Sequence, residues 1–428
     1  MEESHETISR HPKGLPTLFF TEMWERLSYY GMRALLVLYL VKELHFTDEK
    51  AGRLYGLYTS LVYLTPIFGG FLADRYLGYR RSIYLGSILM LCGHISLAVP
   101  SLESFYLGLG LLILGNGFFK PNMSTVVGRL YENKPNLRDS GYTIFYMGIN
   151  LGGLIGPIIC GSLGEKVNWH YGFGAAGFGM AIGLIIFYFG SRNLPEHIWV
   201  NERSKPIIMD EKLDSHFKYR VSLILLLSIF SILFWMAFEQ MGSSLNLFAD
   251  RYTDRSLLGI EIPASFFQSI NPLFILCLSP LIAYLWKRLS FFSLNPDPIL
   301  KFVISFLLLS IGFLVMVWAA KTQNQIGMVS AWFLLGAYFF NTLSELLLSP
   351  VGLSFVSGTA PAKYVGMLMG FWFLSTAFGH YIAGYLAGYF NSFPSLADFF
   401  LFFVYTSLFG AVVLFLLWFR IRHWLKIF

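Results

Sequence analysis

The sequence predicts an all-α membrane protein with twelve transmembrane helices arranged as two six-helix bundles. The first observation is composition: 55% of the 428 residues are hydrophobic and 13% are Asp, Glu, Lys or Arg, about half the roughly 25% that is usual in a soluble domain. This shortage of charge excludes a soluble enzyme, a disordered protein and a disulfide-rich scaffold. The other two observations are the recurrence of long apolar runs and a single long polar segment at residues 192–219 that divides them six and six.

The apolar runs follow one another along the chain with short connections. A helix needs about 20 apolar residues to cross a bilayer, and lipid cannot satisfy a bare backbone, so each run is predicted to be a helix. Because the runs use most of the chain, we expect no large domain outside the membrane. They lie at residues 15–44, 51–73, 82–99, 104–128, 140–163, 172–191, 220–249, 264–286, 299–320, 329–358, 364–390 and 397–421.

Lys and Arg gather in alternate connections, which predicts that both termini face the cytoplasm. The loops on the other side hold fewer cations or balance them with acids, as in Asp250 and Arg251. The net charge of +6 is therefore a signal of topology, and we expect no binding of nucleic acid. The cationic connections carry Arg75, Arg80 and Arg81; Arg129, Lys134 and Arg138; Arg192, Arg203, Lys205, Lys212, Lys218 and Arg220; Lys287 and Arg288; and Arg420, Arg422 and Lys426.

The runs and the polar segment together predict the organisation of the chain. Six spans on each side of a solvated linker is the layout of transporters built from two repeated halves. A cytoplasmic amphipathic helix within the linker is the lesser alternative. The predicted parts are a cytoplasmic N-terminal segment (1–14), a first bundle (15–191), the cytoplasmic linker (192–219), a second bundle (220–421) and a cytoplasmic tail (422–428).

Seven ionisable residues lie well inside the predicted spans. Such groups cost several kcal/mol at membrane depth unless they are paired or hydrated, so they are candidates for function. Four of them fall in the first span, where positions 22, 26, 29, 30 and 33 cluster towards one helical face that is expected to look into a cavity. The alternative is a structural salt bridge that only holds helices together. The seven are Glu22, Glu25, Arg26, Arg33, Lys120, Glu239 and Glu345.

The signs of these seven charges suggest a way to carry a proton. Four are carboxylates and three are cations, so at full ionisation one carboxylate lacks a cationic partner. A carboxylate that is removed from water without such a partner favours its protonated form. The count therefore predicts proton coupling, but it does not identify the carboxylate that carries the proton.

Several motifs coincide with these charges. The first span contains an ExxER pattern that is followed by two tyrosines and a glycine. Later segments read GGFLADRYLGYRR (69–81), GNGFFKPNMS (115–124), FYMGINLGG (145–153), FEQMGSSLNLFA (238–249), FQSINPLF (267–274), SELLLSPVGLS (344–354) and GFWFLSTAFG (370–379). Together they resemble the proton-dependent oligopeptide transporter (POT, or PTR) family of the major facilitator superfamily, over about residues 12–390.

The resemblance implies that Glu22, Glu25 and Arg26 couple proton movement to transport. It also implies that Arg33 pairs with Glu239, itself a candidate for protonation, in an outer gate. Lys120 and Glu345 would form an inner gate, with Arg33 and Lys120 binding the carboxylate of a peptide and Glu345 its amino group. The residues that would line the rest of the pocket are Tyr29, Tyr30, Tyr63, Asn150, Asn271, Ser349, Trp372 and Phe373.

Physical chemistry agrees with this division of roles. A zwitterionic peptide needs a cation and an anion in one cavity, and here the cations come from the first half and Glu345 from the second. A substrate that bridges the halves suits alternating access. In span 5, Gly148, Gly152 and Gly156 permit close helix packing, and Pro350 is a candidate kink. Ordinary membrane-helix composition is an equal alternative for both features.

One feature departs from the family pattern, because many bacterial members carry two extra helices between the halves. Residues 192–219 contain too few apolar residues for even one span, so the chain is expected to have the twelve-span form. The resemblance implies a multi-pass protein of the bacterial inner membrane that acts as a monomer on short peptides, with protons as the coupling ion and no other cofactor. The alternatives are a carrier for nitrate or a drug-like molecule, and a membrane receptor without transport.

Cysteines and histidines carry less information. Cys92, Cys160 and Cys277 all fall in apolar runs, which predicts that they are buried by packing. The nine histidines show no spacing that suits a metal, so His170 and His380 are assigned to packing or to the membrane interface. We find no nucleophile motif of a membrane-embedded enzyme.

Overall fold

The computed structural model describes residues 10–199, 217–257, 259–361 and 364–422, and these are almost entirely helical. Each apolar run predicted before the linker coincides with one long helix. The helices are α1 (Leu15–Lys42), α2 (Asp48–Leu72), α3 (Tyr79–Leu97), α4 (Leu102–Leu130), α5 (Arg138–Lys166) and α6 (Trp169–Gly190). A π-helical turn at Ala73–Leu77 continues α2, and short 3-10 turns lie at Pro135–Leu137, Ser191–Asn193 and Glu196–Ile198.

The runs predicted after the linker are helical too, with one interruption. The run at 220–249 is divided, because a 3-10 turn at Glu239–Gly242 separates α7 from α8. A second 3-10 turn, Ala264–Ser269, leads into α9. The helices are α7 (Phe217–Phe238), α8 (Ser244–Tyr252), α9 (Ile270–Phe291), α10 (Pro298–Ile326), α11 (Trp332–Thr359), α12 (Val365–Ala387) and α13 (Leu396–Ile421).

Side-chain caps determine where several of these helices begin. In each case a side-chain oxygen accepts a hydrogen bond from a backbone N–H of the first turn, which has no partner within the helix. The caps start α2, α4, α6, α10 and α13, and they are Thr47, Ser101, Asn168, Asp297 and Ser395.

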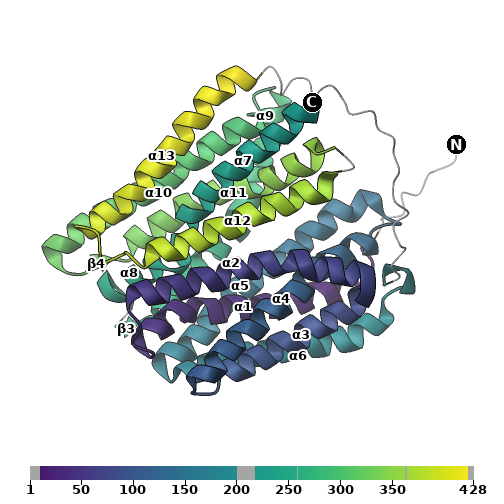
Figure 1. The fold of residues 1–428 in the computed structure, drawn as a ribbon, viewed down its shortest axis with the longest axis horizontal. Helices are drawn as coiled ribbons and strands as arrows, with labels where there is room; N and C mark the ends of the chain where they lie inside the picture. Colours follow the sequence, from purple (N-terminus) through teal and green to yellow (C-terminus); the bar gives the residue numbers. More distant parts are fainter. Residues whose placement is uncertain (1–9, 200–216, 258, 362–363, 423–428) are drawn as a thin grey trace.

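Four very short strands lie together at one end of the molecule. Strand β1 (Thr253–Asp254) pairs in parallel with β4 (Val329–Ser330), and β2 (Ser256–Leu257) pairs antiparallel with β3 (Ile260–Glu261). Figure 1 places β3, β4 and α8 at the left. We call this the strand end, and we call the opposite end, where α6 ends and α7 begins, the linker end.

Within the described residues, ten helical segments are long and apolar enough to cross a membrane. The two long helices outside this set are α1 and α3. Helix α1 carries Glu22, Glu25, Arg26 and Arg33 in its central part, and α3 carries two arginines in its first turn. The chain is therefore a helical, multi-pass membrane protein, and its two least apolar long helices carry several of the charges in the motifs.

The helices gather in two groups that follow the order of the chain. In Figure 1, α1 to α6 fill the lower part, and α7 and α10 to α13 fill the upper part. Helices α2 and α12 face each other where the groups meet. Residues 200–216 of the predicted linker, and with them most of the possible amphipathic helix, lie outside the described residues. The division into two bundles at this linker therefore stays a prediction.

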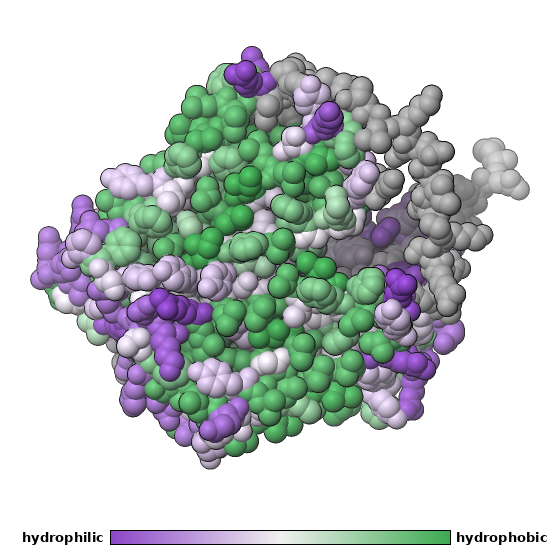
Figure 2. Space-filling view, viewed as in Figure 1, coloured by the Kyte–Doolittle hydropathy of each residue, from purple (hydrophilic) through white to green (hydrophobic). Residues whose placement is uncertain are grey.

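Contacts between the groups close the strand end. A Cβ built on Gly56 of α2 would lie 2.8 Å from the carbonyl oxygen of Tyr381 and 2.9 Å from the Cα of Gly384 in α12. The two backbones therefore touch directly. Nearby ion pairs join Lys42 to Asp250 at 2.9 Å and Arg251 to Asp48 at 2.6 Å. Towards the linker end, Figure 2 shows the surface hollowed between the two groups.

Two of the three cysteines are not buried as predicted. Cys160 is buried in α5, but Cys92 and Cys277 are exposed. A membrane-spanning helix is apolar on the face that lipid covers as well as on the face that packs, so an apolar neighbourhood in sequence does not separate the two environments.

The contact between α2 and α12 generates a prediction about stability. Gly384→Ala places a Cβ against the backbones of Gly52 and Gly56, and overpacking of this kind costs about 1–3 kcal/mol. We expect a clear fall in the melting temperature of the purified protein in detergent. The matched control is Gly370→Ala on the same helix, because a Cβ there meets nothing within 4 Å. Equal melting temperatures for the two variants would contradict the close contact.

Candidate functional site

The ExxER motif forms a buried cluster on α1. The Nε of Arg26 lies 2.9 Å from Oε1 of Glu22 and 2.6 Å from Oε2 of Glu25. All three side chains are at most 3% exposed. Two carboxylates thus share one guanidinium, an arrangement that favours a proton on one of them because like charges in one site repel.

Glycines of α5 bring the neighbouring helix against this cluster. A Cβ on Gly152 would lie 2.8 Å from the backbone nitrogen of Leu27, and one on Gly156 would lie 3.0 Å from that of Gly31. Gly148, one turn earlier, packs against the ring of Phe19. The four-residue glycine spacing therefore does permit close packing of α5 on α1, which helps to keep water away from the charges.

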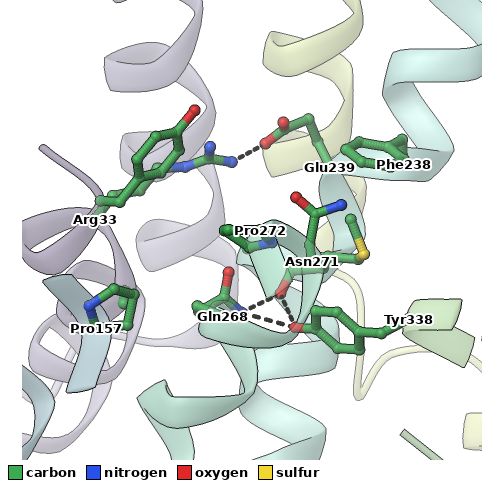
Figure 3. Close-up of a pocket in the computed structure, with 12 residues that line it drawn as sticks. Arg33, Pro157, Phe238, Glu239, Gln268, Asn271, Pro272 and Tyr338 are labelled. Atoms are coloured by element: carbon green, nitrogen blue, oxygen red, sulfur yellow. Dashed lines mark hydrogen bonds and ion pairs between the residues drawn. The ribbon is translucent and has the colours of Figure 1, made fainter. Parts of the chain in front are cut away.

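A second buried ion pair joins the two halves of the chain. Arg33 of α1 donates to Glu239, which lies in the 3-10 turn between α7 and α8, as Figure 3 shows. The Nε of Arg33 also donates to the hydroxyl of Tyr55 at 2.9 Å. Arg33 and Glu239 are 14% and 5% exposed. The structure thus brings together the two residues that the resemblance assigned to the outer gate.

The residues assigned to the inner gate are not paired. Glu345 of α11 accepts a hydrogen bond of 2.9 Å from the amide of Asn271, which also donates to Thr342 at 3.1 Å. Lys120 makes no ion pair with any residue in the described part of the chain, and its Nζ lies 4.4 Å from the ring centre of Tyr63. The ion pair of Lys120 and Glu345 that the resemblance implies is therefore not formed in this structure, and the inner gate stays a prediction.

These partners refine the count of four carboxylates against three cations. Among the described residues, Glu345 is the carboxylate of the four that has no cation. Because Glu22 and Glu25 share Arg26, one cation is also left over, and it is Lys120. The molecule thus holds a carboxylate and a cation inside the bundle that could each take a new partner.

A small pocket lies beside the Arg33–Glu239 pair, and Figure 3 shows these two side chains meeting across it. Its volume is about 50 Å³, enough for a few water molecules and far below the roughly 300–1,000 Å³ of ligand sites. The lining residues are Tyr30, Arg33, Ala34, Pro157, Phe238, Glu239, Met241, Gly242, Gln268, Asn271, Pro272 and Tyr338. A peptide would need additional space, in the direction of the hollow at the linker end.

Other residues predicted to bind substrate lie outside this lining. Tyr29 is buried beneath the guanidinium of Arg26, whose Cζ is 5.6 Å from its ring centre. Asn150 donates to the carbonyl of Tyr146 on its own helix at 2.9 Å. Ser349 is half-buried in α11. The roles of these residues in binding stay predictions.

The predicted aromatic pair on α12 is divided between two environments. Trp372 is 3% exposed, packs over Gly352 and makes an edge contact with Phe302. Phe373, the next residue, is 39% exposed. Consecutive positions on a helix point in directions about 100° apart, so the two rings cannot share one wall. Neither ring lines the pocket beside Arg33 and Glu239.

Sequence reasoning missed two residues that hold the pocket together. The Nε2 of Gln268 donates to the carbonyl of Met241 at 2.5 Å and to the hydroxyl of Tyr338 at 2.9 Å, and that hydroxyl donates to the same carbonyl at 3.1 Å. This carbonyl lies in the turn that interrupts the helix, and buried backbone groups without a helical partner are satisfied by side chains. The signal available in sequence was the presence of Gln268 in the FQSINPLF motif.

His380 is the third missed residue. Its Nδ1 lies 3.4 Å from Oε2 of Glu239, and its ring packs between Tyr63 and Trp235 with centroid separations of 4.3 Å and 5.7 Å. It is 1% exposed. The assignment of His380 to packing therefore omitted its position directly beside a buried carboxylate.

The POT family model, PTR2, matches residues 80–199 and 200–402. The peptide transporter YePEPT of Yersinia enterocolitica is 34% identical over 90% of this chain and 89% of its own. A di-/tripeptide transporter of Lactococcus lactis subsp. lactis is 33% identical over 96% of each chain.

The fold has a close match among solved structures. The crystal structure of peptide transporter POT in complex with sulfate superposes with a TM-score of 0.85 at 32% sequence identity. The alignment covers 96% of this chain and 95% of the matched one.

The buried pair between the halves generates a prediction that a double-mutant cycle can test. Arg33→Met or Glu239→Met alone leaves an unpaired charge in the protein, which costs about 3–5 kcal/mol. The double variant removes both charges, so we expect it to lose much less stability than the sum of the two single losses. Thermal unfolding in detergent measures all four proteins.

The control cycle uses Arg53 and Glu49, an ion pair whose side chains are 53% and 49% exposed. Exposed pairs contribute about 0–1 kcal/mol, so this cycle should be nearly additive. If the cycle of Arg33 and Glu239 were as additive as the control, the pair would not stabilise the contact between the halves.

Proposed function

This chain belongs to the POT family and is a transporter, not an enzyme, and on this premise we propose that it is a proton-coupled symporter that imports di- and tripeptides by alternating access. The observation that carries the proposal is the set of buried charges. Arg33 and Glu239 meet between the two halves, and Lys120 and Glu345 lie apart with neither in an ion pair among the described residues. The cations of this set could bind the carboxylate of a small zwitterion, and Glu345 could bind its amino group.

The proposed topology has twelve spans and both termini in the cytoplasm of a bacterial cell, in its inner membrane. The linker end then faces the cytoplasm and the strand end faces outwards. Contacts through glycine backbones and ion pairs close the strand end, and the surface is hollowed towards the linker end (Figure 2). This arrangement is what an inward-facing state of a monomeric carrier requires.

Peptide binding and proton binding are proposed to meet at Arg33. Its guanidinium is engaged by Glu239 and by the hydroxyl of Tyr55, so a peptide carboxylate must compete with Glu239 for it. A proton on Glu239 removes that carboxylate's charge and frees Arg33 for the peptide. His380, whose Nδ1 lies 3.4 Å from Glu239, is a second titratable group that is close enough to be affected when Glu239 is protonated.

The remaining charges are proposed to complete recognition. Lys120 is free to bind the peptide carboxylate together with Arg33, because it forms no ion pair with a described residue. Glu345 is free to bind the peptide amino group, because its partner is the neutral amide of Asn271. Hydrogen bonds to charged groups contribute about 1.5–3 kcal/mol each, so both ends of a short peptide would matter to affinity. Protons are the coupling ion, and no further cofactor is proposed.

A carrier for another small anion, such as nitrate, or for a drug-like molecule is the alternative. A small anion would use Arg33 and Lys120 but would give Glu345 no role. A receptor without transport would need no group that titrates inside the bundle. Competition of uptake by dipeptides, tripeptides, single amino acids and nitrate separates these possibilities.

Proteoliposomes with an imposed pH gradient test proton coupling directly. We expect dipeptide uptake to rise when the outside is more acidic, and uptake that is equal with and without the gradient would exclude symport. Glu22→Gln removes a carboxylate that shares Arg26 with Glu25. We expect this variant to lose gradient-driven uptake but to retain counterflow exchange, because exchange needs no net proton movement. Equal loss of both activities would assign Glu22 a structural role.

Binding of a dipeptide and of its C-terminal amide tests carboxylate recognition. In Lys120→Ala, affinity for the free carboxylate is expected to fall about tenfold to a hundredfold, the loss of one charged hydrogen bond. Affinity for the amide should change little. An equal loss for both ligands would remove Lys120 from carboxylate recognition. Lys287→Ala, at an exposed position near the end of α9, is the control for the loss of one positive charge.

A further inference from the structure

A groove on the outer surface of the first half lies between α3 and α6. Its volume is about 670 Å³, within the range of ligand sites and much larger than the pocket between the halves. It is lined by four residues from α3 and four from the end of α6 and the turn after it: Arg80, Arg81, Tyr84 and Ile88, and Leu184, Ile185, Tyr188 and Arg192.

The spacing of these residues gives the groove a charged end and an apolar end. On each element they recur at intervals that share one helical face, with the arginines towards the linker end. Ile88 follows Arg80 by eight residues, which is about 12 Å along a helix at about 1.5 Å per residue. Ile88 and Ile185 are 48% and 55% exposed. Figure 2 shows the lower part of the molecule as mostly apolar between hydrophilic left and right edges.

The charged end holds three cations that no described acid pairs with. Arg80, Arg81 and Arg192 form no ion pair with any described residue. Arg192 lies over the ring of Tyr188 at 4.1 Å and Arg80 over that of Trp199 at 5.7 Å, so aromatic rings position two of the guanidinium groups.

The two described acids nearby, Asp74 and Glu196, do not pair with these arginines. Asp74, before α3, accepts a hydrogen bond of 2.8 Å from the hydroxyl of Tyr79. Glu196, in the turn after α6, is exposed. Among the described residues these three arginines have no counter-ion, which is an electrostatic cost that a bound anion offsets. Guanidinium is well suited to phosphate because it donates two parallel hydrogen bonds.

The polarity of the groove identifies the kind of anion. A soluble phosphate would use only the arginines and would leave the apolar end without a role. A phospholipid places a phosphate at the membrane surface and an acyl chain along the helices below it, in the same direction as the gradient from Arg81 to Ile88. Basic pockets between spanning helices on the cytoplasmic side suit anionic headgroups.

We propose that the groove between α3 and α6 is a binding site for an anionic glycerophospholipid, with Arg80, Arg81 and Arg192 holding the headgroup phosphate and Ile88, Leu184 and Ile185 contacting an acyl chain. The site lies outside the transport pathway and does not depend on which substrate the protein carries. Because it joins two helices of one half, its occupation stabilises the folded protein by mass action.

The experiment uses the purified full chain in detergent and measures the melting temperature and, by native mass spectrometry, the lipid that stays bound. Phosphatidylglycerol is expected to raise the melting temperature and to be retained, and phosphatidylcholine to do neither. In the variant R80Q/R81Q/R192Q, the preference for phosphatidylglycerol should fall about a hundredfold, since each of the three arginines contributes about a factor of five.

The matched control is K287Q/R288Q/R420Q, which removes three exposed positive charges from the other half. It should keep the full preference for phosphatidylglycerol. An unchanged preference in the first triple variant, or an equal loss in the control, would overturn the proposal. A rise in melting temperature with inorganic phosphate alone, as large as with phosphatidylglycerol, would also overturn it, because the site would then bind a soluble anion.

The apolar end is tested separately with Ile88→Trp, which fills the groove and leaves all three arginines in place. Weaker retention of phosphatidylglycerol with an unchanged melting temperature in the absence of lipid supports the proposed acyl contact. Full retention would show that the acyl chain does not lie in this groove.

Discussion

The ion pair between Arg33 and Glu239 joins helices from the two halves of the chain and lies where water has little access. Removing a charge from water costs several kcal/mol, and only a close partner of opposite sign offsets that cost. Each half therefore supplies the opposite charge that the buried charge of the other half requires. An anion that binds Arg33, or a proton that neutralises Glu239, changes this balance directly.

Close backbone contacts make such burial possible. Glycines of α5 allow α1 to approach without intervening side chains, and glycines of α2 and α12 do the same between the halves. Each contact excludes water from neighbouring charges, and the charges in turn require partners within the protein. Packing and electrostatics thus act on the same few positions, including the cluster of Glu22, Glu25 and Arg26 and the pair of Arg33 and Glu239.

The interior charges and the basic groove on the outer surface differ in physical character. Inside, carboxylates and cations are mixed, so a ligand or a proton must replace an existing partner. In the groove between α3 and α6, three arginines converge without an ion pair among the described residues, so an anion can bind without displacing anything. The first arrangement suits a cycle of binding and release, and the second suits a ligand that stays bound.

The sequence alone determined the helices, because long apolar runs can be satisfied in lipid only as helices, and it determined which charges would lie inside them. The motifs also anticipated the pairing of Arg33 with Glu239. Only the tertiary structure showed that Cys92 and Cys277 are exposed, because lipid-facing and packed surfaces are equally apolar. It also placed a turn at Glu239–Gly242 inside an unbroken apolar run, and with it a backbone carbonyl at Met241 that Gln268 and Tyr338 satisfy. Whether Lys120 meets Glu345 depends on how the two halves are arranged, and the distance between residues of different halves is a property of conformation that no local pattern encodes.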